Sequence, residues 1–168
     1  VPEEFLAYLE NERGAHADDP PILRDLAHYE WVELALSISP LVLTPELADP
    51  DGDLLAGVPL VSPLAWTLSY DFPVQRIGPD FQPADADGQV TYLIVNRDRN
   101  DRVRFLEINA VTARLMELMS ESPHDHGGVL LAQISAELQH PEPLALMEAG
   151  RAIFQQLRER DIVLGTRR

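Results

Sequence analysis

The chain has 168 residues, of which 45% are hydrophobic and 24% charged, a balance typical of globular proteins that excludes wholesale disorder. Its 28 acidic and 13 basic residues give a net charge of −15, and it contains no cysteine. This composition excludes a disulfide framework, a thiolate metal site and a thiol nucleophile. It also disfavours binding to nucleic acid, because neutralising a phosphate backbone requires a positively charged surface.

Two helices are predicted at the N-terminal end. Pro2 followed by two glutamates is typical of a first helical turn, and Gly14 ends this short helix. The second helix, over residues 22–39, is apolar on more than one face, so it lies at the centre of a core or touches something on both sides. Residues 40–73 carry prolines at 40, 45, 50, 59, 63 and 73 among apolar residues. This spacing predicts an extended segment wrapped along a folded body.

From residue 72 onward the pattern predicts a small sheet followed by helices. Short strands are expected over 74–77, 90–95 and 103–108, with a polar turn over 97–101. Asn109 is expected to cap a helix that runs to about residue 119, and two more helices follow, over about 129–139 and up to about residue 160. A short strand or tail over 162–164 completes the chain.

We therefore predict an α+β fold in which N-terminal helices and a proline-rich extended wrap (residues 1–71) pack on a winged-helix-like body (residues 72–168). The acidity is uneven between these portions. Residues 1–71 hold 14 acidic residues and 2 arginines (net −12), whereas residues 72–168 hold 14 acidic residues and 11 arginines (net −3). This distribution favours a basic peptide or protein as the partner.

No set of residues in the sequence indicates a catalytic centre. His28 and Glu30 lie two positions apart on a predicted helix, so they point to different faces and lack the i, i+4 spacing of a helical metal chelate. The run Asp49–Asp53 has a superficial likeness to a calcium loop but lacks the glycine and glutamate that such a loop needs, and we interpret it as a turn. We predict no catalytic residue, no metal ligand and no cofactor.

Two possible binding surfaces remain in the predicted winged helix. Its third helix can enter a DNA groove, or the edge of its sheet can accept a peptide strand. One side of this helix carries Met147 and Arg151, which suit a peptide better than DNA because Glu148 and Glu159 lie nearby.

Several segments of the second half resemble the PqqD-like peptide-recognition element. They are Thr91–Val95, Val103–Asn109, Leu115–Leu118 and Phe154–Val163. The resemblance implies a hairpin that ends in an asparagine cap, two short helices and a final helix. We hypothesise that a peptide pairs with the strand edge formed by Arg102, Val103, Arg104, Phe105 and Leu106 and lies against the helix that bears Met147 and Arg151.

Segments of the first half are similar to the C-terminal domain of HvfC/BufC-type proteins, which are related to the MbnC component of methanobactin biosynthesis. They are Phe5–Leu9, Leu23–Glu33, Ser62–Trp66 and Tyr70–Val74. In that family a helical N-terminal domain precedes this region, and because the chain begins with Val1 we expect it to be a fragment or a processed product.

The resemblance implies a non-catalytic cytoplasmic protein that pairs with a TIM-barrel multinuclear-iron oxygenase and helps it modify the cysteines of a ribosomally made precursor peptide. It also implies an interface with that partner around His28, Tyr29 and Trp31. Two alternatives stay open. One is a transcriptional regulator whose DNA-binding domain lies in a missing N-terminal part, and the other is a metal enzyme that uses His28, Glu30 and Glu33.

Overall fold

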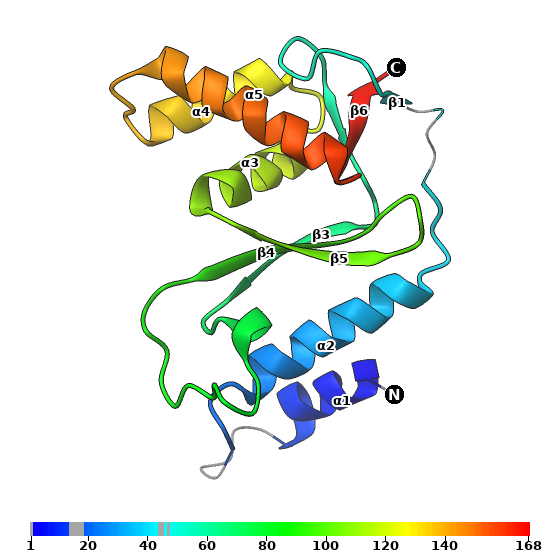
Figure 1. The fold of residues 1–168 in the computed structure, drawn as a ribbon, viewed down its shortest axis with the longest axis vertical. Helices are drawn as coiled ribbons and strands as arrows, with labels where there is room; N and C mark the ends of the chain where they lie inside the picture. Colours follow the sequence, from blue (N-terminus) through cyan, green and yellow to red (C-terminus); the bar gives the residue numbers. More distant parts are fainter. Residues whose placement is uncertain (1, 14–18, 44–45, 47) are drawn as a thin grey trace.

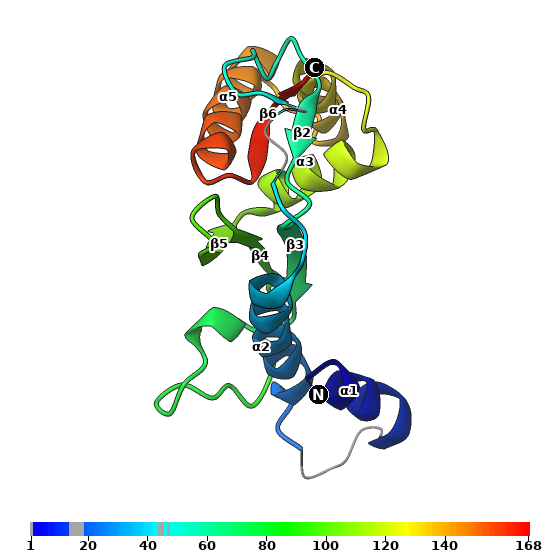
Figure 2. The same cartoon turned by 90° about the vertical axis from the view of Figure 1, so that its right-hand side faces the viewer.

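The computed structural model describes residues 2–13, 19–43, 46 and 48–168. Helices α1 (Pro2–Tyr8) and α2 (Leu23–Ile38) lie at one end of the molecule, and a π-helical turn, Leu9–Arg13, extends α1. Above α2 lies a three-stranded antiparallel sheet in the order β3-β4-β5, called the central sheet below, and α3, α4 and α5 lie beyond it (Figure 1). Figure 2 shows the same layers from the side, where they form one elongated column.

The central sheet joins β3 (Ala65–Tyr70), β4 (Thr91–Arg97) and β5 (Val103–Ile108). The two strands predicted for the hairpin are confirmed. β3 falls in the segment predicted to be extended, but it is a full strand that pairs with β4 from Ala65 opposite Asn96 to Tyr70 opposite Thr91. The proline-rich segment therefore supplies part of the sheet.

A short 3₁₀ helix, η3 (Val74–Arg76), occupies the place where a strand was predicted, so that prediction is wrong. Pro73 precedes it, and the N–H groups of Arg76 and Ile77 donate to the carbonyls of Pro73 and Val74 at 2.9 and 3.2 Å. Val74 is buried in a cluster with Tyr70, Phe72 and Leu93. Burial of this one side chain fixes the segment as a tight turn instead of a paired strand.

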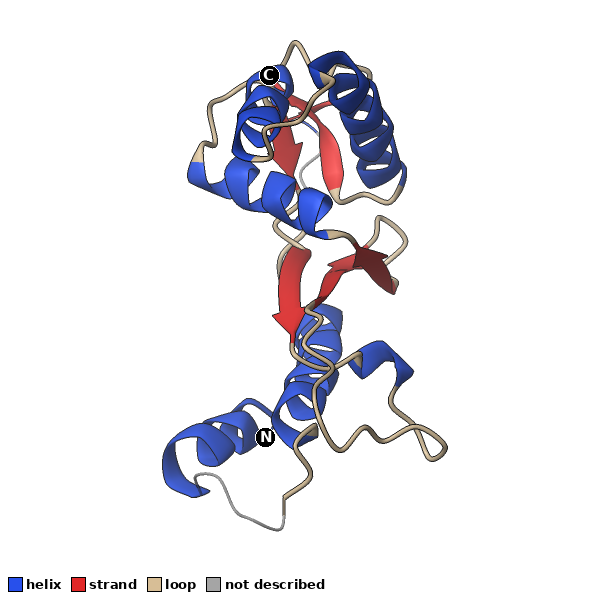
Figure 3. Cartoon of the chain, turned by 90° about the vertical axis from the view of Figure 1, so that its left-hand side faces the viewer, coloured by secondary structure: helices blue, strands red, loops and turns tan. Residues whose placement is uncertain are grey.

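The three helices that follow the sheet are confirmed as α3 (Ala110–Glu121), α4 (Gly127–Glu137) and α5 (Pro143–Glu159). As predicted, Asn109 caps α3, because its side-chain oxygen accepts a hydrogen bond from the Thr112 N–H at 2.8 Å. The chain is therefore an α+β protein, with strand layers between helical layers (Figure 3). The winged-helix arrangement itself stays a prediction.

A second three-stranded sheet, the terminal sheet, is built from distant segments. Strand β6 (Val163–Arg167) lies between β1 (Ala48–Asp49) and β2 (Pro59–Val61), antiparallel to both. Of the two forms expected for residues 162–164, a strand or a tail, the structure has a strand, and it extends to Arg167. Both sheets pair strands from either side of the boundary expected after residue 71, so main-chain hydrogen bonds join the two portions of the chain.

The largest hydrophobic core lies between the central sheet and α3–α5. Its fully buried side chains include Ile94, Leu115, Leu130, Phe154 and Leu157. A smaller core on the opposite face of the sheet holds Val32 and Leu36 of α2 against Leu64 and Val95. The central sheet is thus covered on both faces, which leaves its edges as the places where its backbone meets solvent. Within the described part of the chain, no helix is long and apolar enough to cross a membrane.

Candidate functional site

Strand β5 forms one outer edge of the central sheet. The Asp98 N–H donates to the Arg102 carbonyl at 2.9 Å, and the Arg97 N–H donates to the Leu64 carbonyl at 3.0 Å. The N–H and C=O groups of successive residues point to opposite sides of a strand. The even-numbered residues of β4 therefore form hydrogen bonds with β5, and the odd-numbered residues form them with β3. In the observed register Asn96 lies opposite Arg104. The main-chain groups of Val103, Phe105 and Glu107 therefore point outward, and no strand of the described residues pairs with them.

The side chains of β5 separate into two faces. Val103 and Phe105 pack against the core on the α2 side, and the Phe105 ring lies 4.9 Å from that of Tyr29, centroid to centroid. Leu106 packs against the core on the α3–α5 side. The outward backbone of β5 thus runs between two helical layers, with ordered side chains above and below it.

Arg104 lies on the α5 side of β5, at one end of the exposed edge. Its Nε donates to Asp98 Oδ2 at 3.2 Å, and Asp98 Oδ1 also accepts from the backbone N–H groups of Asn100 and Arg102 at 2.9 and 3.0 Å. Burial pushes the pKa of Asp98 upward, but these hydrogen bonds outweigh it and hold the pKa below its ordinary value. Asp98 therefore stays ionised and orients Arg104.

The α5–β6 corner packs beside this end of the hairpin. The Arg99 guanidinium and backbone N–H both bind the buried carboxylate of Asp161, with Nε to Oδ1 at 2.7 Å. The Asn96 side chain donates to the Arg160 carbonyl at 2.8 Å. Between the corner and the hairpin lies a depression of about 520 Å³. Its lining residues are Asp98, Arg99, Asn100, Arg104, Arg158, Glu159, Arg160 and Asp161.

Met147 and Arg151 lie elsewhere, so the structure does not bring them together with the β5 edge. Arg151 points to the loop before β2, where its guanidinium is 3.8 Å from Asp53 Oδ1. That loop and α5 enclose a depression of about 620 Å³. Met147 lines an apolar groove between α4 and the start of α5, beside Ala132 and Ala136. It is the C-terminal end of α5, not its middle, that adjoins the exposed strand.

The predicted partner residues on α2 face their own sheet. His28 Nδ1 is 3.0 Å from the Tyr70 hydroxyl, and the Trp31 ring lies 5.9 Å from that of Trp66. Tyr29 is half-buried; burial raises the pKa of its hydroxyl, and Glu33 and Glu30 raise it further. These side chains attach α2 to the central sheet. The outer face of α2 carries Leu34 and Ile38, which are 40% and 70% exposed.

Sequence reasoning missed Arg97, the last residue of β4. Its side chain is buried, and its guanidinium donates to the carbonyls of Leu36, Ser37, Ser39 and Leu41. It thereby binds the C-terminal end of α2, where helix carbonyls lack partners within the helix. An arginine as the last residue of a largely apolar strand is the local signal for such a role.

No group of three metal-ligating side chains converges anywhere within residues 2–13, 19–43, 46 and 48–168. The comparison with protein families gives one clear result: a model of the HvfC C-terminal domain matches residues 62–158. A search of curated proteins found no match. The matched region begins just before β3 and ends in the last turn of α5, so it contains the central sheet, its exposed edge and all of α3 and α4. The chain therefore belongs to the HvfC C-terminal domain family, and this membership suggests a partner protein associated with the maturation of ribosomally made peptides.

Proposed function

We propose that this chain is a non-catalytic subunit that binds a ribosomally made precursor peptide and presents it to a TIM-barrel multinuclear-iron oxygenase, which modifies the cysteines of the peptide. The peptide adds as a strand to β5. The observation that carries the proposal is the outward main chain of Val103, Phe105 and Glu107, bordered by a helical layer on each side. Strand addition uses such an edge: backbone pairing supplies affinity, and side-chain contacts supply specificity.

The second partner, the oxygenase, is proposed to contact the α2 layer. Two features support this side of the molecule. The exposed Leu34 and Ile38 lie on α2, whose inner face is already packed on the sheet, and residues 1–71 carry 14 acidic residues against 2 arginines. His28, Tyr29 and Trp31 hold this layer in place and are proposed to shape the interface from beneath. The α2 layer thus offers an apolar surface surrounded by acidic residues, and it would fit an apolar patch on the oxygenase that has basic residues at its rim.

A proline at position 107 tests strand addition directly. The Glu107 N–H points away from β4, so Glu107→Pro removes an outward donor while it spares the ladder within the sheet. We expect binding of a short, cysteine-containing candidate precursor peptide, measured by fluorescence anisotropy, to weaken about tenfold or more, because a ladder hydrogen bond is lost and the proline ring obstructs the edge.

Two variants serve as controls for this experiment. Glu107→Ala removes the same side chain but keeps the N–H, and it should bind nearly as well as the wild type. Ser69→Pro places proline at the equivalent outward position of β3, on the opposite edge of the sheet. Weakening by Ser69→Pro but not by Glu107→Pro would move the site to β3, and equal affinity for all variants would rule out strand addition. Circular dichroism establishes that each variant is folded.

A further inference from the structure

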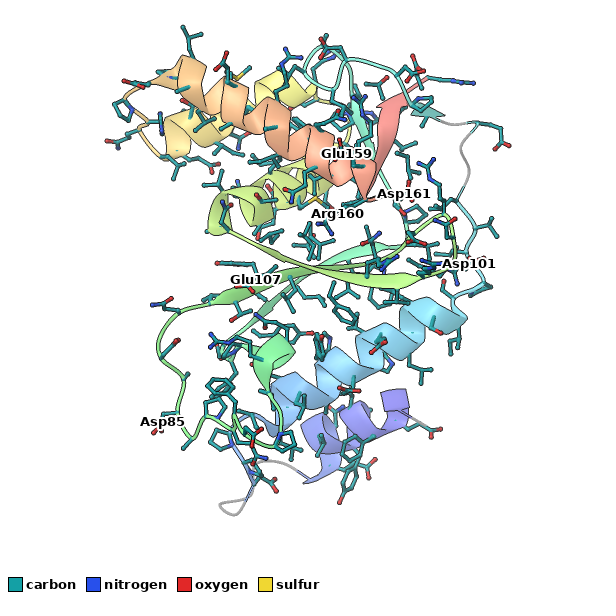
Figure 4. All side chains as sticks on the ribbon, viewed as in Figure 1. Asp85, Asp101, Glu107, Glu159, Arg160 and Asp161 are labelled. Atoms are coloured by element: carbon teal, nitrogen blue, oxygen red, sulfur yellow. The ribbon has the colours of Figure 1, made fainter. Side chains whose placement is uncertain are left out.

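Arginine side chains gather in the depression at the end of the β5 edge. Arg99, Arg104, Arg158 and Arg160 line it together with three acidic residues, so its local charge is positive in a chain whose net charge is −15. Figure 4 shows Arg160 between the C-terminal end of α5 and strand β5, beside Glu159 and Asp161.

The acidic residues of this depression already have partners. Asp161 accepts hydrogen bonds from Arg99, and Asp98 accepts from two backbone N–H groups and from Arg104 Nε. Glu159 accepts from the Gln155 side chain at 2.9 Å. Each carboxylate in the depression therefore accepts at least one hydrogen bond from the chain itself.

Two arginines retain donors that face the depression. Arg104 uses Nε for Asp98, which leaves its two terminal nitrogens, and its side chain is 51% exposed. Arg160 is exposed and forms no ion pair with any carboxylate of the described residues. Arg158, by contrast, donates to the carbonyls of Pro50 and Gly52. Arg99 already uses Nε and Nη2 for Asp161, so the two arginines with both terminal nitrogens available are Arg104 and Arg160, a pair suited to a carboxylate.

The ladder geometry specifies where such a carboxylate would lie on an added strand. The backbone of Arg104 bonds to β4, so in an antiparallel addition the residue opposite Arg104 forms a non-hydrogen-bonded pair, in which side chains approach most closely. That residue points to the same face of the sheet as Arg104, towards the depression and Arg160.

We propose that the segment that adds to β5 carries an aspartate or glutamate opposite Arg104, and that Arg104 and Arg160 together bind its carboxylate. This inference rests on strand addition at β5 and specifies the class of peptide: an extended segment with one acidic residue at a fixed register. The two arginines act as specificity determinants, while the backbone of β5 supplies pairing that does not depend on sequence.

The test is a set of double-mutant cycles with the same cysteine-containing candidate precursor peptide. Each aspartate or glutamate of the peptide is replaced in turn by asparagine or glutamine, and affinity is measured for the wild type, Arg104→Gln, Arg160→Gln and Arg168→Gln. We expect one acidic position whose replacement weakens binding to the wild type about fivefold to tenfold but leaves binding to the Arg104 and Arg160 variants nearly unchanged. Arg168→Gln removes the same charge at the C-terminal end and should behave like the wild type.

The outcomes separate this inference from the proposed function. If Glu107→Pro abolishes binding but no acidic position couples to Arg104 or Arg160, the carboxylate site is overturned and strand addition stands. If Arg168→Gln weakens binding as much as Arg160→Gln, the effect comes from overall charge and the specific site is overturned as well. If the wild type does not bind the peptide, both proposals fail.

Discussion

Arg97 joins two layers of the protein through a single side chain. It ends a strand of the central sheet, and its guanidinium binds main-chain carbonyls at the end of α2, with Nη1 to the Ser39 oxygen at 2.8 Å. A sequence cannot reveal this role, because the partners lie 56 to 61 positions earlier in the chain and are backbone carbonyls, which every residue type has. The Asn109 cap, in contrast, acts three residues away and was predictable from its local pattern.

Removal of the Arg97 guanidinium should loosen α2. Arg97→Met keeps much of the apolar stem but leaves several partly buried carbonyls without donors, and we expect the free energy of unfolding to fall by about 2–4 kcal/mol. Urea denaturation followed by circular dichroism measures this change. Arg102→Met, at an exposed position of the same hairpin, should change it by no more than about 0.5 kcal/mol. Equal effects of the two substitutions would show that the contacts to α2 contribute nothing specific.

At the scale of elements, local signals predicted β4, β5 and the three helices after them, because each carries a clear apolar period. β3 lies between Pro63 and Pro73, and the density of prolines around it obscured six residues that pair with β4 along their whole length. The sequence also did not indicate which end of α5 adjoins the sheet. Met147 and Arg151 occupy a suitable helix face, but the corner at Arg160 and Asp161 is the part that meets the hairpin.

The N-terminus of α4 packs so closely on the loop before β2 that it requires a glycine. A Cβ on Gly127 would lie 2.1 Å from the Leu54 carbonyl oxygen and 2.9 Å from the Phe154 ring. We expect Gly127→Ala to destabilise the protein by about 1–3 kcal/mol, through forced displacement of the backbone. The matched control is Gly78→Ala, where a Cβ would meet no atom within 4 Å, and its unfolding midpoint should stay close to that of the wild type. A midpoint that is the same for both variants would contradict this packing.

At the scale of the whole molecule, each sheet joins segments from both portions of the chain. β3 precedes residue 71 and pairs with β4 after it, while β1 and β2 precede it and pair with β6. The pairing of β6 could not be predicted, because the sequence of a five-residue strand does not indicate which distant strands pair with it. The boundary after residue 71 separates two portions that differ in charge and proline content. That these portions are separate folding units stays a prediction.

We expect the chain to unfold in one cooperative transition. Trp31 and Trp66 are in contact and report on the α2 side of the central sheet, whereas circular dichroism reports mainly on the helices, most of which lie on the opposite side. If the layers depend on one another, tryptophan fluorescence and circular dichroism give the same urea midpoint. Separate midpoints would show that the α2 side and the α3–α5 side of the central sheet unfold independently.

The position of β6 has a consequence for how the protein is made. A ribosome releases β1 and β2 long before it has synthesised Val163–Arg167, the strand that pairs with both of them. Until then the strands of the central sheet can pair with one another, but the terminal sheet cannot form. A chain cut short by premature termination before residue 163 would expose two unpaired strands and lose Val163 from the main core. Because unpaired strand edges are templates for pairing with other chains, such a shortened chain would be prone to aggregate through β1 and β2.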